Sequence, residues 1–183
     1  MHQNAKSRHC QAISQVMQTA SFLYLGCPKS ATQWFLRAYW HQRIREEVGN
    51  EAAVVSMGDY NDEPFNRSLT EYSLAISSRK KVVSPYARNP WFYNLMWRFL
   101  GHDVATYYFS STPNMLDQFL VSEGMLKDDS IFSVDEDSVE IIRFPEMLKG
   151  DYDAPREFGR PSGTLDEDGF SDHFPIGMVV REA

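Results

Sequence analysis

Apolar and polar residues alternate along the chain in a way that predicts both helices and strands. Residues 33–48 carry apolar side chains at intervals of three and four, and Gly49-Asn50 is a typical stop, so this stretch is predicted to be a helix. The apolar run at residues 52–57 follows at once and ends at Gly58, which is typical of a buried strand. A helix, a short turn and a buried strand indicate part of an α/β fold.

Shorter elements follow. Apolar spacing predicts helices over residues 68–76 and 91–100, and strands over residues 106–109, 115–121, 139–142 and 176–180. The strands at 106–109 and 115–121 flank turn-forming residues, so we expect them to pair as a hairpin. Residues 149–169 are rich in Asp, Gly and Pro and are predicted to be a long loop, a kind of segment that is usually functional or disordered.

The N-terminal residues carry the weakest pattern. Residues 1–32 are mostly polar, and apolar spacing predicts one short helix at residues 13–20. No signal peptide is recognised, and no run reaches the roughly 18 apolar residues of a membrane span. The cytoplasm is therefore the default expectation for localisation.

Composition and charge narrow the class of protein. The 183 residues are 43% hydrophobic and 14% aromatic, which fits one globular domain with a core. The formal net charge is −7, and residues 127–172 hold 14 acidic against 5 basic residues, so this segment carries −9 and the rest +2. This balance argues against a nonspecific nucleic-acid binder. Cys10 and Cys27 form neither a disulfide framework nor a metal-ligand spacing.

Oxygen-bearing side chains follow the predicted strand at residues 52–57. Asp59, Asn61 and Asp62 come directly after Gly58, and Pro64 fixes the exit of the chain. Such residues often serve only as a turn, because their side chains bond to nearby backbone groups. Their place at the end of a buried strand favours a second use, as a site for a metal or a phosphate.

A second chemical group lies near the C-terminus. Asp172 and His173 stand between the predicted long loop and the last strand, and the pKa of histidine near neutrality suits proton transfer. Asp117 lies in the apolar strand at residues 115–121. It is either an outward-facing polar residue or a carboxylate that faces the same cleft and orients the imidazole of His173.

Taken together, three motifs resemble those of the endonuclease/exonuclease/phosphatase family, whose fold is deoxyribonuclease-I-like. They are residues 58–64 (GDYNDEP), residues 116–118 (LDQ) and residues 171–175 (SDHFP). The first and last are specific, and the middle one supports them. The resemblance implies an α/β (α+β) fold, arranged as a four-layer α/β/β/α sandwich.

The resemblance also implies an activity and residue roles. The expected activity is hydrolysis of a phosphate ester that depends on Mg²⁺ or Mn²⁺. Asp59 would orient or deprotonate the attacking water, and Asn61 would bond the phosphoryl oxygens or a metal-bound water. His173, oriented by Asp117, would stabilise the developing negative charge or move the proton, and Asp172 would bind or position the metal. Hard oxygen ligands suit Mg²⁺, and a metal neutralises charge on phosphoryl oxygens.

The sequence departs from the family pattern at its start. The family's first half carries an Asn, a metal-binding Glu and a His, and none of these is found before residue 33. Residues 25–30 (LGCPKS) stand where that His would fall. We therefore expect residues 38–183 to be the C-terminal half of such a domain, incomplete at the N-terminus. We expect residues 1–37 to be a poorly patterned, non-native or disordered segment, and the chain alone to have little activity.

Two other hypotheses stay open at this point. The chain could be a catalytically inactive domain that binds or assembles, or an unrelated α/β domain with coincidental motifs. The substrate is also open among nucleic acid, small-molecule phosphates and lipid phosphates, as is the oligomeric state. The acidic segment disfavours long duplex DNA. The aromatic residues at 91–93 could stack a base, although core packing is the commoner use.

Overall fold

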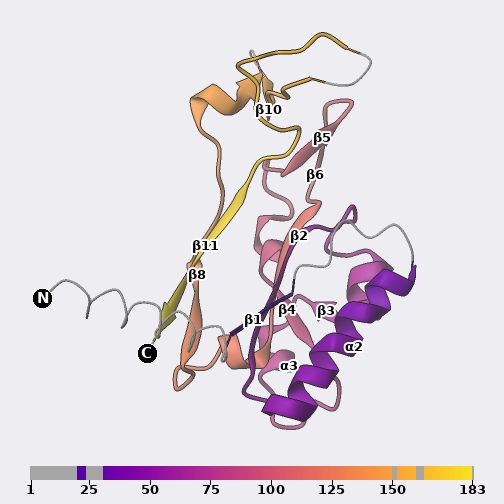
Figure 1. Ribbon diagram of the computed structural model, residues 1–183, viewed down its shortest axis with the longest axis vertical. Coiled ribbons are helices and arrows are strands. Elements are labelled where there is room, and N and C mark those ends of the chain that lie inside the picture. The colour runs from indigo at the N-terminus through magenta and orange to yellow at the C-terminus, as the bar shows by residue number, and fades with distance from the viewer. Residues whose placement is uncertain (1–19, 24–30, 150–151, 160–162, 183) are drawn as a thin grey trace, which may run out of the picture.

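A five-stranded sheet is the largest element that the computed structural model describes, and the described residues are 20–23, 31–149, 152–159 and 163–182 (Figure 1). The strands, in their order across the sheet, are β1 (Ala20–Leu23), β2 (Ala53–Asp59), β7 (Asp117–Val121), β4 (Phe92–Asn94) and β3 (Ala75–Ile76). The pairs β1–β2 and β3–β4 are parallel, whereas β7 is antiparallel to both β2 and β4. The fold is thus mixed α/β, and the predicted strand at residues 52–57 is confirmed.

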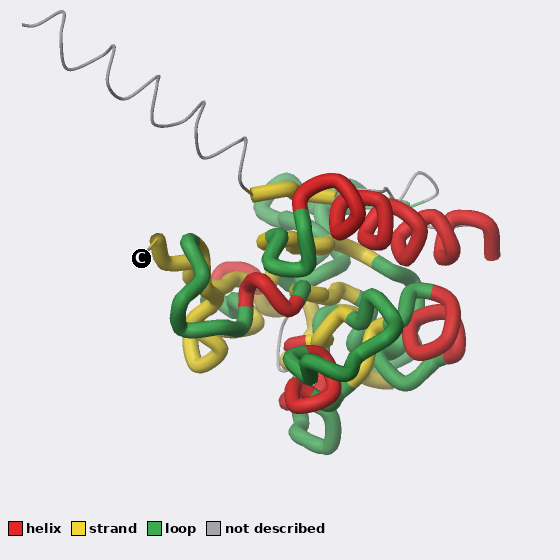
Figure 2. The backbone as a smooth tube through the Cα atoms, turned by 90° about the horizontal axis from the view of Figure 1, so that it is seen from below, coloured by secondary structure: helices red, strands yellow, loops and turns green. Residues whose placement is uncertain are grey.

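Helix α2 (Ala31–Val48) packs on one face of this sheet and confirms the helix predicted over residues 33–48. Alternate residues of β2 and β7 point toward it, and Ile44 packs against the buried cluster that includes Val54 and Leu120. The buried imidazole of His41 stacks on the ring of Phe92 with 4.0 Å between ring centroids. Figure 2 shows α2 running along one side of the strands.

The opposite face of the sheet is covered by a two-stranded antiparallel ribbon of β8 (Phe132–Ile141) and β11 (Ile176–Glu182). Its inward residues join the cluster that holds Val55 and Phe119. The strand predicted at residues 176–180 is confirmed, and the one predicted at residues 139–142 is the end of the longer β8. The described layers are therefore α2, the five-stranded sheet and the β8–β11 ribbon.

Short elements connect these layers within the described residues. The hairpins are β5 (Tyr107–Phe109) with β6 (Thr112–Asn114), and β9 (Leu148–Lys149) with β10 (Tyr152–Pro155). The helical turns are η1 (Ser68–Tyr72), α3 (Arg79–Val82), η2 (Leu95–Phe99), η3 (Glu123–Met125) and η4 (Pro145–Met147). The predicted loop at residues 149–169 thus contains the short strand β10.

Three of the predicted elements are wrong. The helix expected over residues 68–76 is the single π-helical turn η1 followed by β3, because Ala75 and Ile76 pair with β4. The helix expected over residues 91–100 is β4 followed by the 3₁₀ turn η2, because residues 92–94 pair within the sheet. The hairpin of residues 106–109 with 115–121 does not form, since β5 pairs with β6 and β7 lies between β2 and β4.

The fold expectations for the N-terminal region lie partly outside the described residues. The short helix at residues 13–20 falls almost wholly there, as does most of the segment 1–37 that we expected to be non-native or disordered. Its described parts are β1, which pairs with β2, and the first residues of α2. Among the described residues, no helix combines the length and the apolar character needed to cross a bilayer.

Replacing Gly124 with alanine should destabilise the fold strongly. A Cβ at Gly124 would lie 2.3 Å from the carbonyl oxygen of Glu51 and 2.6 Å from that of Ala52, so the backbone would have to move. We expect a loss of about 2–3 kcal/mol in the free energy of unfolding, measured by urea denaturation. Gly101→Ala is the control: it has open space and a φ of 82°, so it should cost about 1 kcal/mol. Equal losses in the two variants would contradict the prediction.

Candidate active site

Two acidic residues meet where β2 and β7 lie side by side. Asp59 is the last residue of β2 and Asp117 the first of β7, and the antiparallel register pairs them directly. Gly58 precedes Asp59 with a φ of 129°, a conformation that a residue with a Cβ rarely adopts. Directly opposed residues on antiparallel strands hold their side chains about 5 Å apart, so the register brings two carboxylates to one point.

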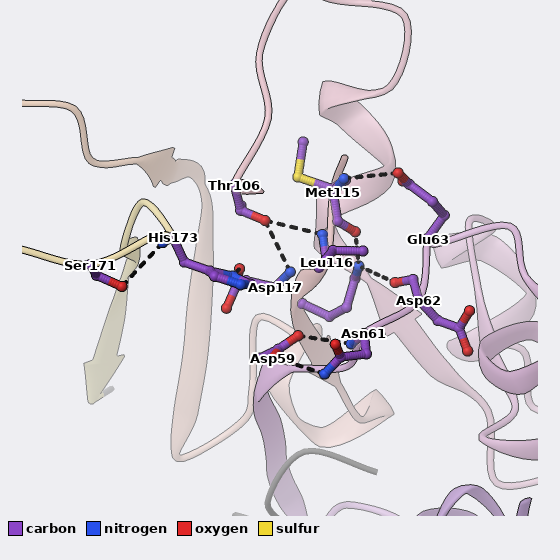
Figure 3. A network of polar contacts seen from close by, with 11 residues as sticks. Asp59, Asn61, Asp62, Glu63, Thr106, Met115, Leu116, Asp117, Ser171 and His173 are labelled. Atoms are coloured by element: carbon purple, nitrogen blue, oxygen red, sulfur yellow. Dashed lines mark hydrogen bonds and ion pairs between the residues drawn. The ribbon is translucent and has the colours of Figure 1, made fainter. Parts of the chain in front are cut away.

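Asn61 closes the turn after β2. Its backbone N–H donates to Asp59 Oδ1 at 2.8 Å, and its side-chain Nδ2 donates to Asp59 Oδ2 at 2.8 Å (Figure 3). Asn61 has a φ of 50°, in the left-handed region that Asn tolerates better than most residues. The turn therefore holds the Asp59 carboxylate by both oxygens.

His173 completes the group from the C-terminal segment. Its Nδ1 lies 2.7 Å from Asp117 Oδ2, and the two side chains are 22% and 15% exposed. The ring of Tyr107 lies 4.7 Å from the imidazole, centroid to centroid, and Tyr107 also forms a β-bridge with His173. The contact that we proposed between Asp117 and the imidazole is present, and it leaves Nε2 as the ring nitrogen that can meet a substrate.

The same three side chains form a candidate metal group. Asp59, Asp117 and His173 each offer a ligand atom, and these atoms all lie within 4.8 Å of one another. Two carboxylates and an imidazole suit a divalent cation of the Mg²⁺ or Mn²⁺ type, with oxygen ligands in the majority.

Electrostatics favour a charged imidazole here. Burial lowers the pKa of His173, but the hydrogen bond and the charge of Asp117, together with the charges of Asp59 and Asp172, raise that pKa by more, so the net shift is upward. An imidazolium beside two carboxylates can donate a proton or stabilise negative charge on a phosphoryl oxygen.

Comparison with known proteins identifies the family of this chain. The sequence model of the endonuclease/exonuclease/phosphatase family matches residues 27–182. The chain belongs to this family. Searches of curated proteins and of solved structures found no significant match. The family assignment confirms the resemblance based on the three motifs and excludes an unrelated α/β domain with coincidental motifs.

Two of the acidic residues of those motifs lie apart from the group of three. Asp62 turns away, since its Oδ1 accepts a hydrogen bond from Asn66 Nδ2 at 2.5 Å. Asp172 is exposed and lines a neighbouring cavity of about 350 Å³, together with Tyr107 and Lys149. The charge of Asp172 contributes to the raised pKa of His173, and the role of Asp172 as a metal ligand stays a prediction.

Sequence reasoning missed residues that support the site. Thr106 and Gln118 are fully buried, and Gln118 Nε2 donates to the carbonyl oxygen of Met115 at 2.5 Å. Glu63 accepts a hydrogen bond from the Met115 N–H at 3.0 Å, and burial raises the pKa of Glu63. For Gln118 the sequence offered one sign of a supporting role: it is an amide within an apolar strand, directly after Asp117, and a buried amide needs hydrogen-bond partners. For Thr106 the sequence offered no such sign, since threonine is common in strands.

Proposed function

We propose that this protein hydrolyses phosphate esters with the help of a divalent metal ion, Mg²⁺ or Mn²⁺. The observation that carries the proposal is the group of Asp59, Asp117 and His173, whose ligand atoms lie within 4.8 Å of one another in a member of the endonuclease/exonuclease/phosphatase family. A divalent metal bound to the carboxylates of Asp59 and Asp117, beside the imidazole of His173, would neutralise charge on the phosphoryl oxygens.

Each side chain then has a role that its position supports. Asp59 orients or deprotonates the attacking water. Asn61 donates its side-chain Nδ2 to Asp59 Oδ2 and so lies beside that carboxylate, where it would bond the phosphoryl oxygens or a metal-bound water. Asp117 holds the Nδ1 side of His173, so that the imidazole presents Nε2 and stabilises the developing charge or moves the proton. Asp172 is proposed as an additional metal ligand.

We further propose that hydrolysis by this chain is slow. Mg²⁺ prefers octahedral coordination by oxygen, and the group of three offers two carboxylates. Weak metal binding would follow, since water would have to supply most of the remaining ligands. A domain that binds a metal without turnover is the alternative, and the experiment below separates the two.

The finer fold and the substrate class are also proposals. We propose a four-layer α/β/β/α sandwich of the deoxyribonuclease-I-like type. The layers of α2, the five-stranded sheet and the β8–β11 ribbon support three of its four layers. The charge of −9 over residues 127–172 favours small or lipid phosphate esters over long duplex DNA.

The test is hydrolysis of bis(p-nitrophenyl) phosphate and p-nitrophenyl phosphate by the purified chain. We expect slow release of p-nitrophenol that requires MgCl₂ or MnCl₂, stops with EDTA and returns when metal is added back. Asp59→Asn should remove it. Calorimetric binding of Mn²⁺ without any hydrolysis would favour the binding domain. The absence of both metal binding and hydrolysis would overturn the proposal.

A further inference from the structure

Thr106 lies between the two chain segments that carry the imidazole and its carboxylate partner. Its side-chain Oγ1 accepts hydrogen bonds from the backbone N–H groups of Leu116 at 3.0 Å and Asp117 at 3.1 Å. Its carbonyl oxygen accepts a hydrogen bond from the N–H of Phe174 at 2.8 Å. Figure 3 shows Thr106 bonded to the start of the strand that carries Asp117, with His173 beside Asp117.

These bonds fix both ends of one contact. The hydroxyl holds the backbone of Asp117 itself, which sets where its carboxylate points. The carbonyl holds Phe174, the neighbour of His173. The distance of 2.7 Å between His173 Nδ1 and Asp117 Oδ2 therefore depends on two segments that are separated by 56 residues and that Thr106 joins.

Burial makes the hydroxyl hard to replace. Thr106 is 0% exposed, so water cannot readily take over as acceptor for the two N–H groups. Tyr107, the next residue, lies against the imidazole from the same short stretch. A shift of Thr106 would therefore move the carboxylate and the aromatic ring that contact His173 together.

We propose that Thr106 is a positioning residue for the imidazole–carboxylate pair of His173 and Asp117. It touches neither substrate nor metal, and acts by holding the two segments at hydrogen-bonding distance. Its effect on turnover rests on the proposed function, whereas its effect on the geometry of the pair does not. Misplacement of a catalytic group by a fraction of an ångström is enough to lower a rate.

The experiment compares four variants. Thr106→Val keeps the shape but removes the acceptor, Thr106→Ser keeps the acceptor, and Thr106→Cys offers a weaker one in case the valine variant does not fold. Ser122→Ala is the matched control. Ser122 is also a buried hydroxyl at the other end of β7, where it accepts from the Val54 N–H at 2.9 Å and donates to the Ala52 carbonyl at 2.7 Å.

Two readouts are measured beside thermal unfolding. The first is the downfield proton resonance of the hydrogen-bonded Nδ1–H of His173 at fixed pH. The second is hydrolysis of bis(p-nitrophenyl) phosphate. We expect Thr106→Val to lose the resonance and to lower kcat about tenfold with KM unchanged. Thr106→Ser should behave as the wild type, Thr106→Cys should be intermediate, and Ser122→Ala should lose stability alone.

Three results decide between the proposals. A wild-type resonance and kcat in the folded Thr106→Val or Thr106→Cys variant overturn the positioning role. So does an equal loss of both readouts in Ser122→Ala, because the effect would then be general destabilisation. A wild-type chain that shows the resonance but no hydrolysis overturns the proposed function, and the resonance in the variants then decides the role of Thr106 by itself.

Discussion

His173→Gln should lower the metal-dependent hydrolysis of bis(p-nitrophenyl) phosphate by about 10²–10⁴-fold. Glutamine keeps a polar side chain of similar reach but cannot carry the positive charge that the imidazole gains beside Asp117. The raised pKa of His173, which its bond to Asp117 and the charges around it produce, is lost with it. The measurement is the initial rate at saturating Mn²⁺.

Asp117→Asn should have an effect of the same order, because an amide no longer stabilises the imidazolium through Nδ1. His102→Gln is the matched control, since His102 is exposed and is not among the residues of the site. Its rate should equal that of the wild type. A His173→Gln variant that keeps more than a third of the wild-type rate would contradict the proposed role.

Acid should destabilise the protein through His41. Burial, followed by the nearby charge of Arg45, lowers the pKa of His41 from 6.5 to about 3, and its Nδ1 bonds to the carbonyl oxygen of Pro90 at 2.9 Å. The folded state holds this imidazole neutral, whereas the unfolded chain protonates it below pH 6.5. The contribution of neutral His41 to the free energy of unfolding is therefore complete above pH 6.5. It is lost as the pH falls toward 3, and the loss reaches about 2 kcal/mol at pH 5.

The variant that tests this is His41→Asn. The Asn Nδ2 can donate to Pro90 in place of the imidazole Nδ1, but it does not titrate. The free energy of unfolding, measured by urea denaturation from pH 7 to pH 5, should fall about 2 kcal/mol less in the variant than in the wild type. Parallel pH profiles of the two proteins would show that His41 is not responsible.

Local pattern predicted the long helix and the buried strand that follows it. The apolar run at residues 52–57 became β2, and the periodic stretch at residues 33–48 became α2. Pattern failed where pairing with distant strands decided the structure. Residues 92–94 have helix-like apolar neighbours, yet they pair with β3 and β7. Tertiary pairing outweighs local preference in such short segments.

In the candidate site, too, local motifs predicted some residues, whereas tertiary contacts decided the others. Asp59, Asn61, Asp117 and His173 were recognised because each stands in a motif, and their contacts with one another follow from the β2–β7 register and the C-terminal segment. Asp62 belongs to the first motif but bonds to Asn66, because the left-handed turn at Asn61 changes the direction of the chain. The support by Thr106 depends on a tertiary contact that no local pattern encodes.

The distance in sequence between the site residues has a consequence for synthesis. Asp117 and His173 are 56 residues apart, and at about 5–20 residues per second a ribosome adds that stretch in roughly 3 to 11 seconds. During that interval the nascent chain already carries both carboxylates of the β2–β7 pair but not the imidazole of His173. The proton transfer that we propose for His173 can therefore begin only after translation has passed residue 173, however early the sheet folds.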